Sequence, residues 1–422
     1  MIKVKGGEDK VLTYYDSEYG AIISRPDSEY DVAFNWTGMA LQDPTLEAIS
    51  QFSTARSLQE VKYATRHFHT PSQNLVVVDD QGNYGLYVIG SIPNRKHSGR
   101  VAVPATQEYQ WKKMIPHWEM PYSENPKRGY VMNANSRVVS PHYGHNLSKL
   151  GFDDLRAIRL VKLLNEDKIF TLDDHKSIQM DNEDQQWFIM KDVLMTTKPS
   201  SDLAKSALEA LGAWDGQAHR DSYEVTIISA WQRELSKIYQ SISKTVPKWA
   251  RPVHDDFFVR NALLSNSSAC HTDQGGCDAF LSQTLEAAVN HLAKQHGTSD
   301  IKQWKWRKAH QALFKHGVFK KVPLLSQFSQ RQISVDGTRD SLNRSRWFAA
   351  RSGFMGTQGA CLRMVVDMDV MTGEFNMPMG ESGNIFSKHY DDLLEGWANG
   401  HYMTLPRTQA RGPEAQLLFY SE

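Results

Sequence analysis

The sequence is poor in cysteine, has no long apolar run and carries no excess charge of either sign. Three of its 422 residues are cysteine, too few for a fold held together by many disulfides. No stretch approaches the roughly 18 consecutive apolar residues of a membrane-spanning helix, so we expect no membrane span. Lys plus Arg and Asp plus Glu each number 48, so no overall field would attract nucleic acid, and no nucleic-acid partner is expected.

The start of the chain also lacks the pattern of a secretory signal. Residues 1–7 read MIKVKGG, in which no apolar core follows the positive charge. Elsewhere, apolar residues make up 40% of the chain and tryptophan occurs 11 times, which predicts a packed core and not a disordered chain. The length suits two or three average domains or one large unit.

Two of the cysteines form a candidate pair. Cys270 and Cys277 lie close together in a polar segment, and two adjacent glycines between them would let the loop close. A disulfide here would imply an oxidising compartment, and two unpaired surface thiols are the alternative. Zinc is not expected, because His271 has no second ligand pair at metal spacing. Cys361 opens an apolar run and is expected in the core.

The hydrophobic pattern predicts sheet-forming ends around a helical middle, which is an α+β fold. We expect a sheet-forming part at 1–150, a mainly helical part at 151–250 and a sheet-and-helix part at 251–422. The predicted strands are a strand at 10–24, a hairpin of 75–78 and 84–89, a short strand at 129–135 and a buried strand at 362–370. Two helices are predicted from their caps, one after the capping box 57–60 and one after the cap 171–174. The other predicted helices are 44–55, 153–164, 201–211, 223–242, 278–294 and 387–398.

Five sequence blocks follow one another along the chain. They are PSQNL at 71–75 with the turn that follows it, GYVMNANS at 129–136, WDG with DS at 214–222, WKWRKAH at 304–310, and GESGN, SKHYDD and WANG between 380 and 400. In this order they resemble the blocks of the penicillin acylase (penicillin amidase) family of N-terminal-nucleophile hydrolases, which also includes cephalosporin acylases and acyl-homoserine-lactone acylases. The chain thus resembles most of the catalytic β-subunit of that family, over residues 1–422.

This resemblance implies a fold and a chemistry. The fold is the αββα sandwich, in which two antiparallel sheets lie between layers of helices. Members are made as precursors, and autoproteolysis exposes a Ser as the first residue of the β-subunit. Its hydroxyl attacks an amide carbonyl, and its own α-amino group serves as general base, since the pKa of such an amine is about 7.7–8.0. Water then releases the acyl group from the enzyme.

The resemblance also implies catalytic residues. In the family block that GYVMNANS resembles, the Asn after the small residue gives a side-chain donor to the oxyanion, and by motif match it is Asn135. An Arg downstream helps to position the nucleophile's amine, and Arg156 is the candidate. Arg159 competes for that role, three residues further on the same helix face. Without the resemblance, these residues would be interpreted as a turn-capping Asn and an exposed helix Arg.

Two further positions fall near those that line the family's acyl pocket. They are Gln73 and Ile49, and both could equally be simple packing residues. Many members bind structural calcium, and one ligand would fall at Asn146, where a neutral amide replaces the family's carboxylate. We therefore expect no complete metal site. His67 and His69 are expected near a helix end, without a metal role.

The chain departs from the family's pattern at the catalytic nucleophile. The family's β-subunit opens with Ser-Asn-x-Trp, and no Ser, Thr or Cys of this chain has that context. The α-subunit and the N-terminal part of the β-subunit, with its backbone oxyanion donor, are also expected to be missing partners. Ser382 lacks the second Gly of a G-x-S-x-G elbow, so we interpret it as a loop serine.

These observations leave three hypotheses. The first is a part of an amidohydrolase that cleaves a side-chain acyl amide of penicillin, cephalosporin or acyl-homoserine-lactone type, inactive as an isolated chain. The second is a non-catalytic, degenerate homologue that acts as a binding or assembly protein. The third is an unrelated α+β domain, which the ordered blocks disfavour. By analogy with the family and from the Cys270–Cys277 pair, the expected location is the periplasm or outside the cell, with the signal on an upstream part.

Overall fold

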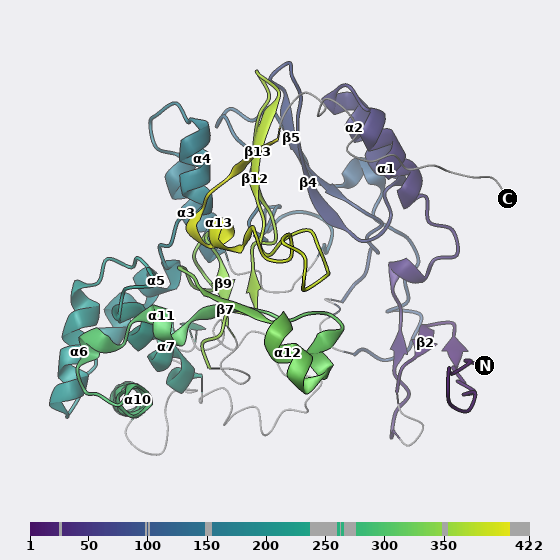
Figure 1. The fold of residues 1–422 in the computed structure, drawn as a ribbon. Helices are drawn as coiled ribbons and strands as arrows, with labels where there is room; N and C mark the ends of the chain where they lie inside the picture. The colour runs from purple at the N-terminus through teal and green to yellow at the C-terminus, as the bar shows by residue number, and fades with distance from the viewer. Residues whose placement is uncertain are drawn as a thin grey trace. The chain divides into compact units, whose positions relative to one another are not determined.

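A computed structural model of the chain describes residues 1–24, 28–97, 99, 102–147, 154–236, 260–261, 263–265, 276–347 and 353–405. It divides the chain into two compact units, Met1–Phe152 and Asp153–Glu422, which are drawn together in Figure 1 and described separately below. The expected sheet-forming part at 1–150 falls within the first unit. The expected helical part and the C-terminal part both fall within the second unit.

The first unit combines two small antiparallel sheets with two helices. Its sheets run in the orders β1-β2-β3 and β4-β5-β6, and short 3₁₀ turns connect several elements. The elements are β1 (Asp16–Ser17), β2 (Gly20–Ile22), β3 (Ala33–Phe34), α1 (Thr45–Thr54), α2 (Leu58–Ala64), β4 (Gln73–Val78), β5 (Tyr84–Ile89) and β6 (Tyr122–Glu124). The predicted hairpin is confirmed as β4 and β5, because Asp79 Oδ1 accepts the N–H groups of Gln81 and Asn83 and so closes the turn.

Helices α1 and α2 cover one face of the β4-β5-β6 sheet. Alternate residues of the paired strands share a face, so Leu75 and its partner Tyr87 both point toward the helices. Tyr87 and Ile89 pack with Leu58 of α2 in a buried cluster. The predicted cap of α2 is confirmed, since Ser57 Oγ accepts the N–H of Glu60 at 3.2 Å. This unit therefore has a core of its own.

In its described residues, the second unit has a helical bundle and three small sheets, with strand orders β7-β8, β10-β9 and β11-β12-β13. Its helices are α3 (Leu155–Leu164), α4 (Leu172–Gln179), α5 (Gln185–Leu194), α6 (Asp202–Ala213), α7 (Glu224–Leu235), α10 (Gly276–His296), α11 (Trp306–Ala309), α12 (Pro323–Ser329) and α13 (Leu394–Asn399). Its strands are β7 (Gln311–Phe314), β8 (Arg331–Ser334), β9 (Ser345–Arg346), β10 (Gln358–Gly359), β11 (Arg363–Asp367), β12 (Thr372–Asn376) and β13 (Met403–Leu405).

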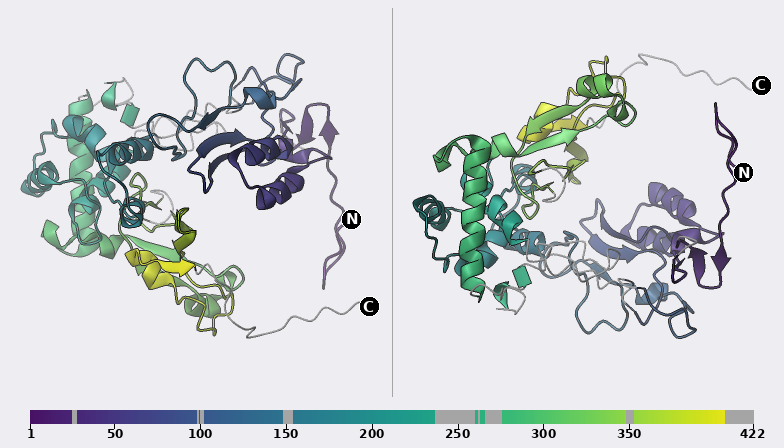
Figure 2. Two further views of the ribbon diagram at one scale, coloured as in Figure 1. Left: turned by 90° about the horizontal axis from the view of Figure 1, so that it is seen from above. Right: turned by 90° about the horizontal axis from the view of Figure 1, so that it is seen from below.

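The largest core of the chain lies between α5, α6, α7 and α10. Helix α10, the long green helix of Figure 2, packs along α7 and α6. Trp231 of α7 is fully buried against it, and the indole N–H donates to Thr284 Oγ1 at 3.0 Å, which satisfies the one polar atom of the ring. The predicted helices 201–211 and 278–294 are confirmed, with Ser201 capping α6.

The block at 304–310 packs into this core. Trp306 is fully buried and stacks on His310, with ring centroids 4.4 Å apart. The imidazole is itself fully buried: Nδ1–H donates to the carbonyl oxygen of Phe354, and Nε2 accepts from Ser345 Oγ at 2.7 Å. Burial lowers the pKa of His310 to about 4, because a charged ring would lose its hydration there. The family-like histidine is thus a neutral core residue.

The β11-β12-β13 sheet corrects two expectations about residues 361–370. The strand is buried on one face alone: α4 packs on that face, where Lys176 pairs with Glu374 at 2.7 Å, while Met364 and Val366 point outward and are exposed. The sequence did not reveal this, because apolar residues occupy both faces of the strand and hide the alternation of buried and exposed positions. Cys361 lies before the strand as an exposed free thiol, so the expectation of a core cysteine is wrong.

The last predicted helix is also shorter than expected. Residues 387–393 form turns, and α13 begins only at Leu394. The turns are stabilised by side chains that compete with helical hydrogen bonding, since Ser387 Oγ accepts the N–H of His389 and Asp392 accepts from the His389 ring. The helix ends at Gly400 with φ of 70°, as the sequence predicts. Within the described residues, no helix is long and apolar enough to cross a membrane.

The buried imidazole of His310 makes stability depend on pH. The unfolded chain binds a proton near pH 6.5, whereas the folded chain resists protonation until about pH 4. The contribution is therefore present above pH 6.5 and is lost as the pH falls toward 4. In His310→Gln we expect a lower free energy of unfolding at pH 7 and a flatter decline over that window, measured by urea unfolding. His175→Gln, which changes an exposed ring, is the control, and parallel curves for wild type and His310→Gln would contradict this account.

Candidate functional site

Asn135 lies in a tight turn that presents its side chain. The backbone of Asn135 is left-handed, with φ of 58°, a conformation that Asn tolerates better than most residues with a side chain. The preceding Ala134 is buried and anchors the turn, while Asn135 itself is exposed. The sequence predicts a strand running into a turn here, and among the described residues only the turn is present.

The turn is fixed by a small network of amide side chains. Asn133 Oδ1 accepts the backbone N–H of Asn135 at 3.0 Å and the side-chain N–H of Asn74 at 3.3 Å. Asn133 Nδ2 in turn donates to the carbonyl oxygen of Ser136 at 3.4 Å. The contact from Asn74 places the beginning of β4, where Gln73 lies, beside the turn. The amide of Asn135 is therefore held on a rigid support.

The two predicted pocket residues lie on the same unit as Asn135. Gln73 is the first residue of β4 and is exposed, and Ile49 lies on α1 with 50% of its surface exposed. Neither side chain is buried within this unit. A role in binding an acyl group stays a prediction for both.

The two candidate arginines of α3 have different surroundings. Arg159 is buried, and its guanidinium donates to both oxygens of Asp181, at 3.0 and 2.6 Å, and pairs with Glu183 at 2.8 Å. These carboxylates raise the pKa of Arg159 against the opposing effect of burial. Arg159 therefore holds α3 to the segment before α5, and Arg156, which is half-buried, remains the candidate for the catalytic role.

Arg344, which the prediction did not single out, lies near Arg156. Two further arginines, Arg339 and Arg346, also lie near Arg344, in the loop that leads to β9 and in β9 itself. Burial first, and then the positive charges of Arg156 and Arg346, lower the pKa of Arg344 to about 10. The signal was visible in the sequence, where GTRDSLNRSR spans all three. It carried no family motif, and its proximity to α3 depends on the fold.

The calcium ligand that the family resemblance implies at Asn146 is a neutral amide that already makes a hydrogen bond in the structure. Asn146 is half-buried, and its side-chain N–H donates to the carbonyl oxygen of His97 at 2.9 Å, so it offers at most one neutral oxygen. Within the described part of the chain, no group of three or more His, Cys, Asp or Glu side chains could hold a metal ion. The amide hydrolysis that the family resemblance implies uses no metal in any step.

Of the two cysteines predicted to pair, the structure describes one. Cys277 opens α10 and is disulfide-bonded, whereas Cys270 lies outside the described residues. The predicted pairing of the two cysteines therefore stays a prediction.

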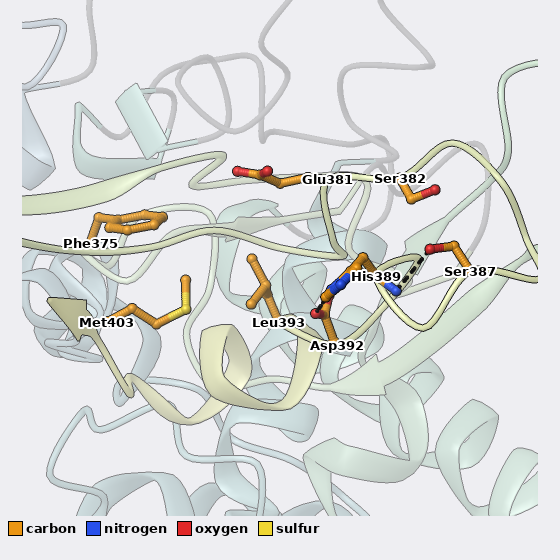
Figure 3. Close-up of a pocket in the computed structure, with 8 residues that line it drawn as sticks. All are labelled: Phe375, Glu381, Ser382, Ser387, His389, Asp392, Leu393 and Met403. Carbon is orange, nitrogen blue, oxygen red and sulfur yellow. Dashed lines mark hydrogen bonds and ion pairs between the residues drawn. The ribbon is translucent and has the colours of Figure 1, made fainter. Parts of the chain in front are cut away.

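A pocket of about 630 Å³ brings Ser, His and Asp side chains together elsewhere in the second unit. Figure 3 shows it lined by Phe375, Glu381, Ser382, Ser387, His389, Asp392, Leu393 and Met403. The hydroxyl of Ser382 accepts the N–H of Asn384, and in Figure 3 it points away from the His389 ring. These side chains stabilise turns, and Ser382 is a loop serine, as the sequence indicates.

The comparisons with known proteins agree with the fold and the motif order. The penicillin amidase family model matches residues 1–414, and the chain belongs to this family. It is 26% identical to acyl-homoserine lactone acylase QuiP of Pseudomonas syringae pv. tomato, over 96% of this chain and 53% of that protein. It is 25% identical to penicillin acylase 2 proenzyme of Pseudomonas sp. strain SE83, over 94% and 52%. The chain therefore spans about half the length of these relatives.

A solved structure shares the fold. The penicillin G acylase of Alcaligenes faecalis superposes with a TM-score of 0.73 at 17% sequence identity, covering 100% of this chain and 81% of the other. The predicted α+β class and N-terminal-nucleophile hydrolase fold are thereby confirmed. At this identity, the likeness concerns the fold alone.

The different surroundings of Arg159 and Arg156 predict that substitution of each arginine changes the free energy of unfolding by a different amount. Arg159→Leu removes the charge that compensates Asp181 and Glu183, so we expect a loss of about 3–5 kcal/mol in the free energy of unfolding. Arg156→Leu is expected to cost less than about 1 kcal/mol. Urea unfolding followed by tryptophan fluorescence would compare the two. An equal loss for both variants would assign Arg156 a structural role and contradict the assignment.

Proposed function

We propose that this chain is the part of an acyl-amide hydrolase that supplies the oxyanion donor Asn135 and the positioning residue Arg156. The nucleophile, an N-terminal Ser, would be supplied by polypeptide outside this sequence. The observation that carries the proposal is the turn at Asn135, where an exposed amide is held in a left-handed backbone conformation by the Asn133–Asn74 network. Its position in the family block at 129–136 supports the assignment.

This turn suits transition-state stabilisation. When a hydroxyl attacks an amide carbonyl, negative charge develops on the carbonyl oxygen, and a donor that is already fixed stabilises that charge without reorganisation. The side-chain N–H of Asn135 is such a donor, because its backbone cannot move without breaking the contacts of Asn133. Backbone strain retained at an exposed residue is typical of functional sites. Arg156 would hold the nucleophile's amine in place, as its position in the family implies.

The substrate class follows from the family and its named members. Relatives of this chain are named as acylases of penicillin and of acyl-homoserine lactone. We therefore propose an amide between an acyl group and a small amine as substrate, with Gln73 and Ile49 near the acyl group. The proposed location is periplasmic or extracellular, which would agree with a Cys270–Cys277 disulfide.

Exposed apolar surfaces support the need for further polypeptide. The outer face of the β11-β12-β13 sheet carries two rows of paired residues, and Met364, Phe375 and Met403 form the first. Val366 and Leu405, both exposed, lie in the second. An apolar sheet face of this kind is normally covered by another layer of structure. The missing α-subunit and the N-terminal part of the β-subunit are the partners that we propose.

The proposal is tested by complementation and by changing Asn135. The chain alone is expected not to hydrolyse a phenylacetyl or fatty-acyl amide. Fused in frame with an upstream segment that begins the β-subunit with Ser-Asn-x-Trp, together with an α-subunit, it should become active. Asn135→Gly keeps the left-handed turn and removes the donor, so kcat should fall about 10²–10³-fold with little change in stability.

Asn125→Gly is the matched control, because Asn125 also has a positive φ, of 41°, in the same unit. Its substitution should leave kcat unchanged. A folded, complemented protein that shows no hydrolysis would reject the enzyme hypothesis and favour the non-catalytic binding or assembly protein. Hydrolysis that does not depend on Asn135 would reject this residue as the oxyanion donor.

A further inference from the structure

The orientation of the Asn133 side-chain amide is set by three neighbours. Its Oδ1 accepts the backbone N–H of Asn135 at 3.0 Å and the side-chain N–H of Asn74 at 3.3 Å, and its Nδ2 donates to the carbonyl oxygen of Ser136 at 3.4 Å. A carboxamide accepts through its oxygen and donates through its nitrogen, so this orientation alone satisfies all three neighbours. Rotation of the amide by half a turn would point Nδ2 at the two donors and lose the three bonds.

Of these three neighbours, Asn74 is the one that lies outside the turn. It precedes Asn133 by 59 residues and is the second residue of β4, where it pairs with Val88 of β5. Leu75 points toward α1 and α2, so Asn74, the residue before it, points to the opposite face of the sheet. The contact between Asn74 and Asn133 therefore fixes the turn against that face, at the beginning of β4.

The orientation of the Asn133 amide matters for the backbone of Asn135. An Asn side chain that accepts the N–H of the second residue after it forms a local turn, and here this bond accompanies the φ of 58° at Asn135. The bond requires that Oδ1 of Asn133, and not Nδ2, faces Asn135. Because the side chain of Asn74 donates to the same oxygen, it stabilises the orientation on which the turn depends.

We propose that Asn74 is a positioning residue, which sets the place of the oxyanion donor Asn135 through the amide of Asn133. This inference rests on the proposed function, which makes Asn135 the donor. Catalytic groups must be held within about 0.5 Å of their productive geometry, and a displacement of about 1 Å can cost about 10²-fold in rate. Gln73, which we propose near the acyl group, directly precedes Asn74 on β4. One strand would therefore set the place of both the acyl group and the donor.

The first experiment follows the turn in the full chain by NMR, with selective ¹⁵N labelling of asparagine. Asn74→Leu keeps the size of the side chain and removes the donor, and it is expected to fold because Asn74 is exposed. The backbone N–H of Asn135, identified as the signal that Asn135→Gly removes, should exchange with solvent about two- to tenfold faster, the effect of one neutral hydrogen bond. An unchanged exchange rate would overturn the inference.

Asn125→Gly is the control for this measurement. It removes a similar contact between two asparagine side chains, in which Asn125 Nδ2 donates to Asn83 Oδ1 at 3.0 Å, at the hairpin end of the same sheet. The exchange of the Asn135 N–H should not change in this variant. Faster exchange in both variants would mean that the turn responds to any loosening of the sheet, and it would remove the specific role of Asn74.

The second experiment measures kinetics in the complemented enzyme described above. Asn74→Leu should lower kcat about 10- to 100-fold with KM unchanged, because a misplaced donor affects the transition state more than the bound substrate. In the Asn135→Gly background the same substitution should cost nothing further, since Asn74 acts through Asn135. An equal loss in both backgrounds would assign Asn74 a structural role, and a rise in KM alone would assign it to acyl binding. Either outcome would overturn the inference.

The inference and the proposed function fail in different ways. If the complemented wild type hydrolyses acyl amides with the help of Asn135, and Asn74→Leu changes neither the exchange rate nor kcat, the positioning role is wrong and the hydrolase proposal stands. If Asn74→Leu loosens the turn and the complemented wild type hydrolyses no acyl amide, the hydrolase proposal is wrong. Asn74 would then hold a turn that has no catalytic role.

Discussion

The ion pairs between Arg159 and the carboxylates of Asp181 and Glu183 are the constraint on which the second unit's candidate site depends. They join α3 to the segment before α5, and the same segment accepts the backbone N–H of Asn343. One buried contact therefore fixes both the helix that carries Arg156 and the loop that carries Arg344. A buried pair of this kind adds little net stability over an apolar contact, but it is strongly directional. Its main effect here is on position, because it fixes α3 and therefore the place of Arg156 relative to the segment before α5.

The parts of the fold that could be predicted are those set by neighbouring residues. The β4–β5 hairpin follows from turn chemistry at Asp79, and the caps at Ser57 and Ser201 follow from side chains that accept the first free N–H groups of a helix. The failures involve tertiary structure. Residues 387–393 have a helical pattern, yet their Ser, His and Asp side chains bond the local backbone and one another. Cys361 sits in an apolar run whose outer face has no cover, and periodicity alone cannot tell a covered face from an open one.

The candidate site was predictable to a different degree at each residue. Asn135 could be found only through its motif, because no local pattern reveals that a residue after Tyr-Val-Met-Asn-Ala has a left-handed backbone. Arg156 and Arg159 could not be separated by spacing, because both lie on one side of α3, and the carboxylates that distinguish them come from a later segment. Arg344 was visible as part of an arginine-rich stretch. Its proximity to Arg156 is a property of the packing, which no sequence pattern contains.

The backbone of Asn135 distinguishes this residue from most buried polar groups of the described residues. Most buried polar groups here are satisfied: His310 has a partner on each ring nitrogen, and Trp231 donates to Thr284. Asn135 keeps a left-handed backbone angle, with φ of 58°, while its side chain is exposed. This conformation is less costly for Gly than for Asn, so replacement by Gly would relieve it. Residues that keep such a conformation cluster at functional sites, and under the proposed function the side chain of Asn135 would supply a donor for the charge that develops on the carbonyl oxygen.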